Sequence, residues 1–159
     1  MNFQNNPLVI NNRVLYFIIM KRTQIGWVFI ILIAAFTIYG FLSSEFSQGY
    51  TLWVLAFLLI ILLLFYNLTI SVDNQYVRFS FGIGIIKGKY ALSEIELCRP
   101  KTYIALGWGI RLRPGVIIFN VSGNKAIELI VKGRKRRVWI GTNSPEELCS
   151  YIHEKIREK

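Results

Sequence analysis

The chain has 159 residues, of which 53% are hydrophobic, and its formal net charge is +10. A chain of this length holds one small folded domain besides any membrane segment, which excludes a large multidomain protein. The excess of cations favours an anionic partner. A basic domain held beside a membrane meets anionic lipid before free nucleic acid, so no nucleic-acid partner is expected.

Residues 1–22 are expected to form an N-terminal cytoplasmic segment. The segment begins with polar residues and becomes apolar from Val14 to Met20, a run that is too short to cross a bilayer. An interfacial helix, a strand added to the folded domain and a poorly ordered segment all fit this pattern. Met20, followed by Lys21 and Arg22, also fits a native translation start.

Two apolar stretches, residues 23–42 and 50–70, predict a transmembrane helical hairpin. Neither stretch contains a charged residue. A bilayer core of about 30 Å takes roughly 20 apolar residues as a helix, and a soluble core helix would show a polar stripe. The short segment between them makes the two helices antiparallel.

The placement of cations predicts the orientation of this hairpin. Lys21 and Arg22 precede the first stretch, Arg78 and Lys87 follow the second, and only Glu45 lies between the two. The positive-inside rule therefore predicts a multi-pass protein of the inner (cytoplasmic) cell membrane, with both termini in the cytoplasm.

From residue 68 the pattern changes to alternation with a period of two, which is typical of half-buried strands. Turn residues at 73–75, 114–115 and 122–124 separate the strands. Eight strands are expected, with Pro100 ending the fourth: 68–72, 76–81, 85–92, 95–99, 110–113, 116–121, 126–132 and 136–141.

A C-terminal helix is expected after these strands. Ser144 is its predicted N-cap, Pro145 its first helical residue and Glu147 the partner in a capping box. Apolar residues at helical spacing form one face, which would cover an open end of the sheet.

This order of elements resembles the bacterial pleckstrin-homology (PH) families of small membrane-attached proteins. The resemblance is carried by residues 68–72, 107–111 and 138–148. It implies an α+β membrane protein in which the helical hairpin precedes a cytoplasmic PH-like domain over 68–159. That domain would be an antiparallel β-barrel or split sheet capped by the terminal helix. The segment before Lys21 departs from the family pattern.

The chain offers few groups for catalysis, so it is expected not to be an enzyme. His153 lies on the last helix without a nucleophile or metal partner at a defined spacing, and Glu94 and Glu96 are interpreted as a solvent-facing pair. No cofactor and no metal are expected. Cys98 and Cys149 lie in a domain predicted to be cytoplasmic and are interpreted as reduced core residues.

Five cations form the strongest candidate site, at the tip of a predicted hairpin. Each cation close to an anionic leaflet contributes about 1 kcal/mol. The alternative is that these side chains only solubilise the hairpin. The candidate lipid- or anion-binding residues are Lys132, Arg134, Lys135, Arg136 and Arg137.

A second candidate contact surface comprises Trp108, Arg111 and Arg113. Glycines on both sides of Trp108 leave its indole either buried in the core or presented outward to a partner.

These features predict a non-enzymatic, membrane-anchored binding or regulatory module. Its partners would be membrane lipids, a partner protein or a second copy of the chain. Two alternatives stay open. The resemblance suggests an immunity or envelope-stress protein that protects against a membrane-active peptide, and the second alternative is an accessory subunit of a membrane complex.

Overall fold

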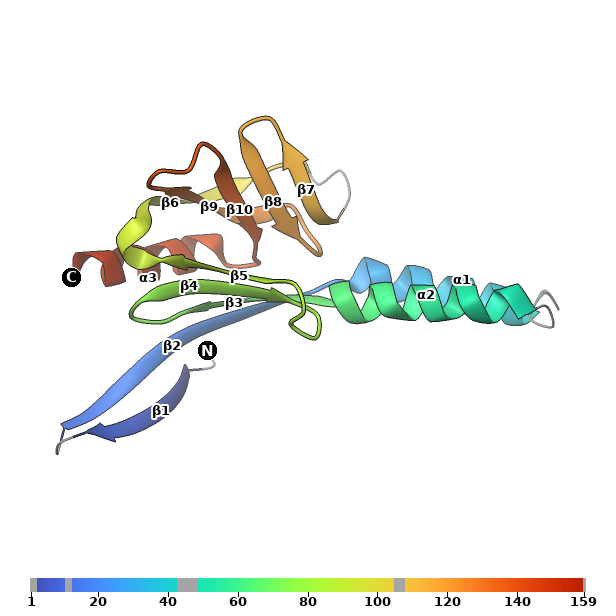
Figure 1. Ribbon diagram of the computed structural model, residues 1–159, viewed down its shortest axis with the longest axis horizontal. Helices are drawn as coiled ribbons and strands as arrows, with labels where there is room; N and C mark the ends of the chain where they lie inside the picture. Colours follow the sequence, from blue (N-terminus) through green and yellow to red (C-terminus); the bar gives the residue numbers. More distant parts are fainter. Residues whose placement is uncertain (1–2, 11–12, 43–48, 105–107, 159) are drawn as a thin grey trace.

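The computed structural model describes residues 3–10, 13–42, 49–104 and 108–158, of which residues 3–19, 41 and 49–51 are described by their backbone only. Figure 1 shows two β-sheets, a helix at one end of them and a helical hairpin that projects from the other end. The elements are β1 (Phe3–Ile10), β2 (Arg13–Ile25), α1 (Trp27–Leu42), α2 (Gly49–Phe65), β3 (Asn67–Val72), β4 (Tyr76–Phe81), β5 (Lys87–Ala91), the short 3-10 helix η2 (Leu92–Glu94), β6 (Ile95–Thr102), β7 (Gly109–Arg113), β8 (Val116–Asn120), β9 (Lys125–Val131), β10 (Arg137–Gly141) and α3 (Pro145–Arg157).

The first sheet has the strand order β1-β2-β3-β4-β5 and is antiparallel throughout. Its β3 strand shows why alternation predicted the structure, because Leu68, Ile70 and Val72 are buried while their neighbours are not. The turn after β3 is closed by the Asp73 carboxylate, which accepts hydrogen bonds from the backbone N–H groups of Gln75 and Tyr76 at 2.8 and 2.7 Å. The predicted β3–β4 hairpin is confirmed.

The two apolar stretches form shorter helices than predicted. α1 has 16 residues and α2 has 17, which at a rise of 1.5 Å per residue gives a length of about 25 Å. The ends of both stretches belong to strands instead, since Thr23 pairs with Thr69 and Ile25 with Asn67.

The predicted transmembrane hairpin over residues 23–42 and 50–70 is therefore wrong, because no helix in the described part of the chain is long and apolar enough to cross a membrane. The predicted multi-pass localisation in the inner membrane is wrong for the same reason.

The helical hairpin joins the first sheet without a flexible linker. Only Gly26 separates β2 from α1, and only Tyr66 separates α2 from β3. The Gly26 N–H donates to the Tyr66 carbonyl at 2.8 Å, which continues the β2–β3 ladder up to the helices. A Cβ at Gly26 would approach the Phe65 carbonyl closely, which explains a glycine at this crossing. The turn after β4 also contacts α2, through the Ile83 N–H and the Leu63 carbonyl at 3.2 Å.

The described residues of the N-terminal segment 1–22, namely 3–10 and 13–22, extend the first sheet. Of the three structures that its pattern allowed, the described residues adopt the strand, because β1 pairs with β2 along the whole of Phe3–Ile10. β2 then runs on to Ile25 and pairs with β3.

The second sheet has the strand order β6-β9-β10-β8-β7. β10 lies between β8 and β9 and pairs with β8 in parallel, with Val138 beside Ile117 and Ile140 beside Phe119. Gly141 makes room for this insertion, since a Cβ there would overlap the side-chain oxygen of Asn120.

The domain over residues 68–159 was predicted to be an antiparallel barrel or split sheet capped by a helix. The α+β class, with two sheets and a C-terminal helix, is confirmed. The purely antiparallel pairing is wrong, because β8 and β10 pair in parallel within the second of two separate five-stranded sheets. Pro100 does not end its strand either, because β6 continues to Thr102. An edge strand tolerates a proline, which cannot donate to a ladder.

Helix α3 covers the sheets beside β6, β9 and η2 (Figure 1). It begins at Pro145 as predicted, with Leu148 and Ile152 buried, although the Ser144 side chain makes no capping hydrogen bond. Cys149 of α3 forms a disulfide with Cys98 of β6, at a Cα–Cα distance of 5.4 Å. The cysteines are buried as predicted, but the prediction of reduced thiols is wrong, because folding joins positions 51 residues apart.

Candidate anion-binding site

The turn between β9 and β10 carries most of the predicted basic site. Gly133 has a φ of +74°, a left-handed conformation that suits glycine, and the Arg134 N–H closes the turn on the Val131 carbonyl at 3.1 Å. The Lys132 N–H donates to the Glu94 carbonyl at 2.7 Å, so the turn is fixed to η2. In Figure 1 this turn lies near η2 and α3, at the end of the molecule away from the helical hairpin.

A cavity of about 310 Å³ opens at this turn. Its apolar floor consists of Ile117 from β8 and Val138 from β10, and its rim consists of Arg134, Lys135 and Arg136. The volume is close to the lower bound for small-ligand sites. Three cations above an apolar floor favour a ligand that has an anionic group.

Arg134 also contacts the first sheet. Its guanidinium carbon lies 5.1 Å from the centre of the Tyr90 ring, a cation–π contact between the β9–β10 turn and β5. Burial raises the pKa of the Tyr90 hydroxyl, although the positive charge of Arg134 opposes this effect. Tyr90 therefore stays neutral at physiological pH and leaves the positive charge of the rim uncompensated.

The structure does not bring all five predicted cations together. Arg137 points to the outer face of the second sheet, where its guanidinium pairs with Glu128 at 3.2 Å. The Trp139 indole N–H donates to the same carboxylate oxygen at 2.9 Å. Arg137 is the first residue of β10, whereas Arg136 belongs to the preceding turn and lines the cavity. Lys132 is exposed at the start of the turn.

Trp108 is 36% exposed and packs edge-on against Phe29 of α1, with the ring centres 6.1 Å apart. Phe29 stacks in turn on Phe65 of α2 at 6.0 Å. The indole is therefore neither buried in the core nor fully exposed to solvent. It connects the segment before β7 to the base of the helical hairpin.

Arg111 and Arg113 lie on the outer face of the second sheet, away from the cavity. The Arg111 guanidinium carbon is 5.9 Å from the Tyr103 ring centre, and Tyr103 packs on Trp139 at 5.4 Å. Burial raises the pKa of the Tyr103 hydroxyl, whereas the charge of Arg111 lowers it. The predicted contact surface is therefore divided between this face and the hairpin base.

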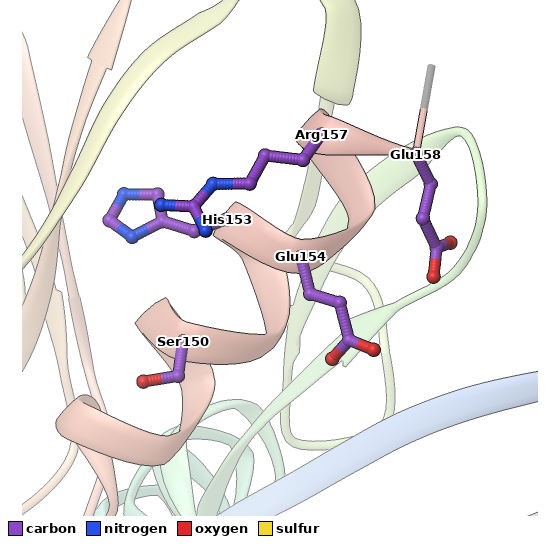
Figure 2. Close-up of a pocket in the computed structure, with 5 residues that line it drawn as sticks. All are labelled: Ser150, His153, Glu154, Arg157 and Glu158. Carbon is purple, nitrogen blue, oxygen red and sulfur yellow. The ribbon is translucent and has the colours of Figure 1, made fainter.

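A second depression, of about 390 Å³, lies along α3. Figure 2 shows the His153 and Arg157 side chains extending to the same side of α3, whereas the Glu154 and Glu158 carboxylates point away from them. His153 Nε2 accepts a hydrogen bond of 3.4 Å from the Cys98 N–H, so this ring connects α3 to β6. No group of three or more metal-ligating side chains occurs among the residues that the structure describes.

Glu94 and Glu96 are both exposed, Glu94 in η2 and Glu96 in β6. An irregularity in the β6–β9 pairing lies between Ile95 and Leu97. The two carboxylates therefore lie on different elements, and both face solvent as predicted.

Sequence reasoning missed Ile117, Val138 and Tyr90 as parts of the candidate site. They come from three strands, β8, β10 and β5, and each is an ordinary apolar or aromatic strand residue. Only the parallel pairing of β8 with β10 places Ile117 next to Val138.

Comparisons of the chain with family models, with curated proteins and with solved structures found no match. The resemblance to the bacterial PH families therefore stays a prediction.

Proposed function

We propose that this protein is a non-enzymatic binding module that engages anionic headgroups at a lipid surface through the β9–β10 turn. The observation that carries this proposal is the convergence of Arg134, Lys135 and Arg136 on one cavity. From residue 68 onward the chain has 16 Lys and Arg against 8 Asp and Glu, a net charge of +8 that adds long-range attraction.

The size of the expected effect follows from the cation count. At about 1 kcal/mol per cation near an anionic leaflet, the three rim residues contribute about 3 kcal/mol, or roughly 100-fold in affinity. The attraction is screened by salt, since the Debye length falls from about 10 Å at 0.1 M to about 3 Å at 1 M.

The direct test measures binding of the full chain to anionic phosphatidylglycerol vesicles and to zwitterionic phosphatidylcholine vesicles. Subtracting the binding free energy for the zwitterionic vesicles from that for the anionic vesicles removes any contribution of the apolar hairpin. Replacing Arg134, Lys135 and Arg136 by Ser should remove most of the preference for the anionic vesicles, as should high salt.

The matched control removes the same charge elsewhere, with Arg99→Ser, Lys101→Ser and Lys125→Ser, all exposed positions on β6 and β9. This variant should keep most of the preference. An equal loss in both variants would show that only net charge matters, and an unchanged preference in the rim variant would contradict the proposed site.

A second candidate function, self-association, is favoured by the exposed apolar surface of α1 and α2. Neither helix contains a charged residue. A monomer rarely exposes more than a few hundred Å² of contiguous apolar surface, whereas a standard interface buries about 800 Å² per partner. We propose a second copy of the chain as the occupant, because its own hairpin offers a surface of the same kind. The exposed large side chains of these two helices include Ile31, Leu32, Trp53, Phe57 and Leu59.

Light scattering in mild non-ionic detergent should then report a dimer of the full chain. Replacing Leu32 and Phe57 by Gln should shift it to a monomer, whereas Ile83→Ser, at an exposed apolar position outside the helices, should not. A wild-type monomer would reject self-association without affecting the anion-binding proposal.

A further inference from the structure

The apolar floor of the cavity continues to the free edge of the second sheet. In the β7–β8 pair Leu112 lies beside Ile117, and in the β8–β10 pair Ile117 lies beside Val138. Paired residues on neighbouring strands share a face, so these three side chains form one row across the sheet. With strands about 4.8 Å apart, the row is about 10 Å long.

This face points towards the first sheet, yet its outer end is uncovered. Leu112 is 69% exposed and Ile110 is 44% exposed, although Phe119, which pairs with Ile110, packs against the core. Phe79, a core residue of the first sheet, packs against Phe119 with the ring centres 4.5 Å apart. The second sheet thus extends past the core and leaves an apolar strip that begins at the cationic rim.

Charge is distributed unevenly along the strip. Arg134, Lys135 and Arg136 line its inner end, whereas Arg111 and Arg113, the cations of β7, alternate with Ile110 and Leu112 and so point to the opposite face. A ligand that matches this surface has an anionic group at one end and an alkyl chain at the other.

We infer that the cavity binds an anionic amphiphile, with its phosphate or carboxylate at Arg134, Lys135 and Arg136 and its alkyl chain along Ile117 and Leu112, next to the buried Val138. This inference rests on the proposed function and extends it from headgroup contact to the capture of a chain. The same chemistry is found in a bilayer lipid and in a free monomeric amphiphile, and soluble probes with a separate vesicle measurement distinguish the two.

The test titrates the full chain with inorganic phosphate, with octyl phosphate and with neutral octyl glucoside, each below its micellar concentration, by calorimetry. Octyl phosphate should bind about 100-fold more tightly than inorganic phosphate if roughly three to four methylenes are buried. Octyl glucoside, which reports the contribution of the helical hairpin, should bind weakly.

Leu112→Ser should weaken the binding of octyl phosphate about tenfold and leave the affinity for inorganic phosphate unchanged. The matched control is Ile85→Ser, an equally exposed apolar position at 69% in the β4–β5 turn, which should change neither. Both positions are on the surface, so thermal unfolding should show that each variant folds. If Leu112→Ser does not affect vesicle binding, the apolar strip binds the alkyl chain of a free monomeric amphiphile. The cationic rim then binds the headgroups of the bilayer.

Equal affinities for octyl phosphate and inorganic phosphate, or an unchanged affinity in Leu112→Ser, would overturn the inference. The proposed function would survive that result provided that the triple Ser variant of the rim still lost phosphate binding. Octyl glucoside binding as tightly as octyl phosphate would overturn the requirement for an anion. Loss of Leu112 dependence together with an unaffected triple variant would reject both proposals.

Discussion

Glu128 shows how a single buried carboxylate organises the outer face of the second sheet. It is 4% exposed and accepts hydrogen bonds from Arg137 and from the Trp139 indole. A buried carboxylate without such partners would carry a large desolvation cost. Arg137, which the sequence placed among the lipid-binding cations, therefore has a structural partner. A run of basic residues could not reveal that the turn ends at Arg136 and that β10 begins at Arg137.

Replacing Glu128 by Ala should destabilise the fold by about 2–3 kcal/mol, since the Trp139 N–H loses its acceptor and a cavity remains. For a chain of this size the melting temperature should fall by roughly 4–12 °C. Thermal unfolding followed by circular dichroism measures the change. Glu96→Ala, at an exposed position, is the control and should shift the midpoint by little; equal shifts would contradict the assigned role of Glu128.

At the scale of elements, local patterns predicted the strands well and their partners poorly. Alternation located β3, β4, β8, β9 and β10 to within a few residues. Hydropathy could not show that residues 23–25 pair with residues 67–69, which is why the helices are shorter than the apolar stretches. The insertion of β10 between β8 and β9 depends on contacts between distant strands, and the cavity floor depends on that insertion.

The attachment of α3 to β6 gives a prediction at this scale. The disulfide Cys98–Cys149 closes a loop with a sequence separation of 51, for which the chain-entropy model gives about 4 kcal/mol of stabilisation. Replacing both cysteines by Ser should lower the melting temperature by roughly 10 °C. A reductant should lower the wild-type midpoint similarly and leave the double variant unchanged. A wild-type midpoint that does not respond to reductant would show that the cross-link contributes nothing.

For the whole molecule, the cationic turn and the helical hairpin lie at opposite ends of the two sheets (Figure 1). The proposed headgroup site and the proposed self-association surface therefore share no residues, and each can be altered without changing the other. Composition predicted a basic domain with an apolar hairpin. It could not predict the distance between the cationic turn and the hairpin, because that distance depends on how the second sheet packs on the first.

The continuous connection between strands and helices has a mechanical consequence. β2 and β3 run into α1 and α2 through Gly26 and Tyr66 alone, and these two residues are hydrogen-bonded to each other. The helical hairpin is therefore fixed rigidly to the first sheet. A change in the angle between the helices and the sheet requires the β2–β3 pairing to distort.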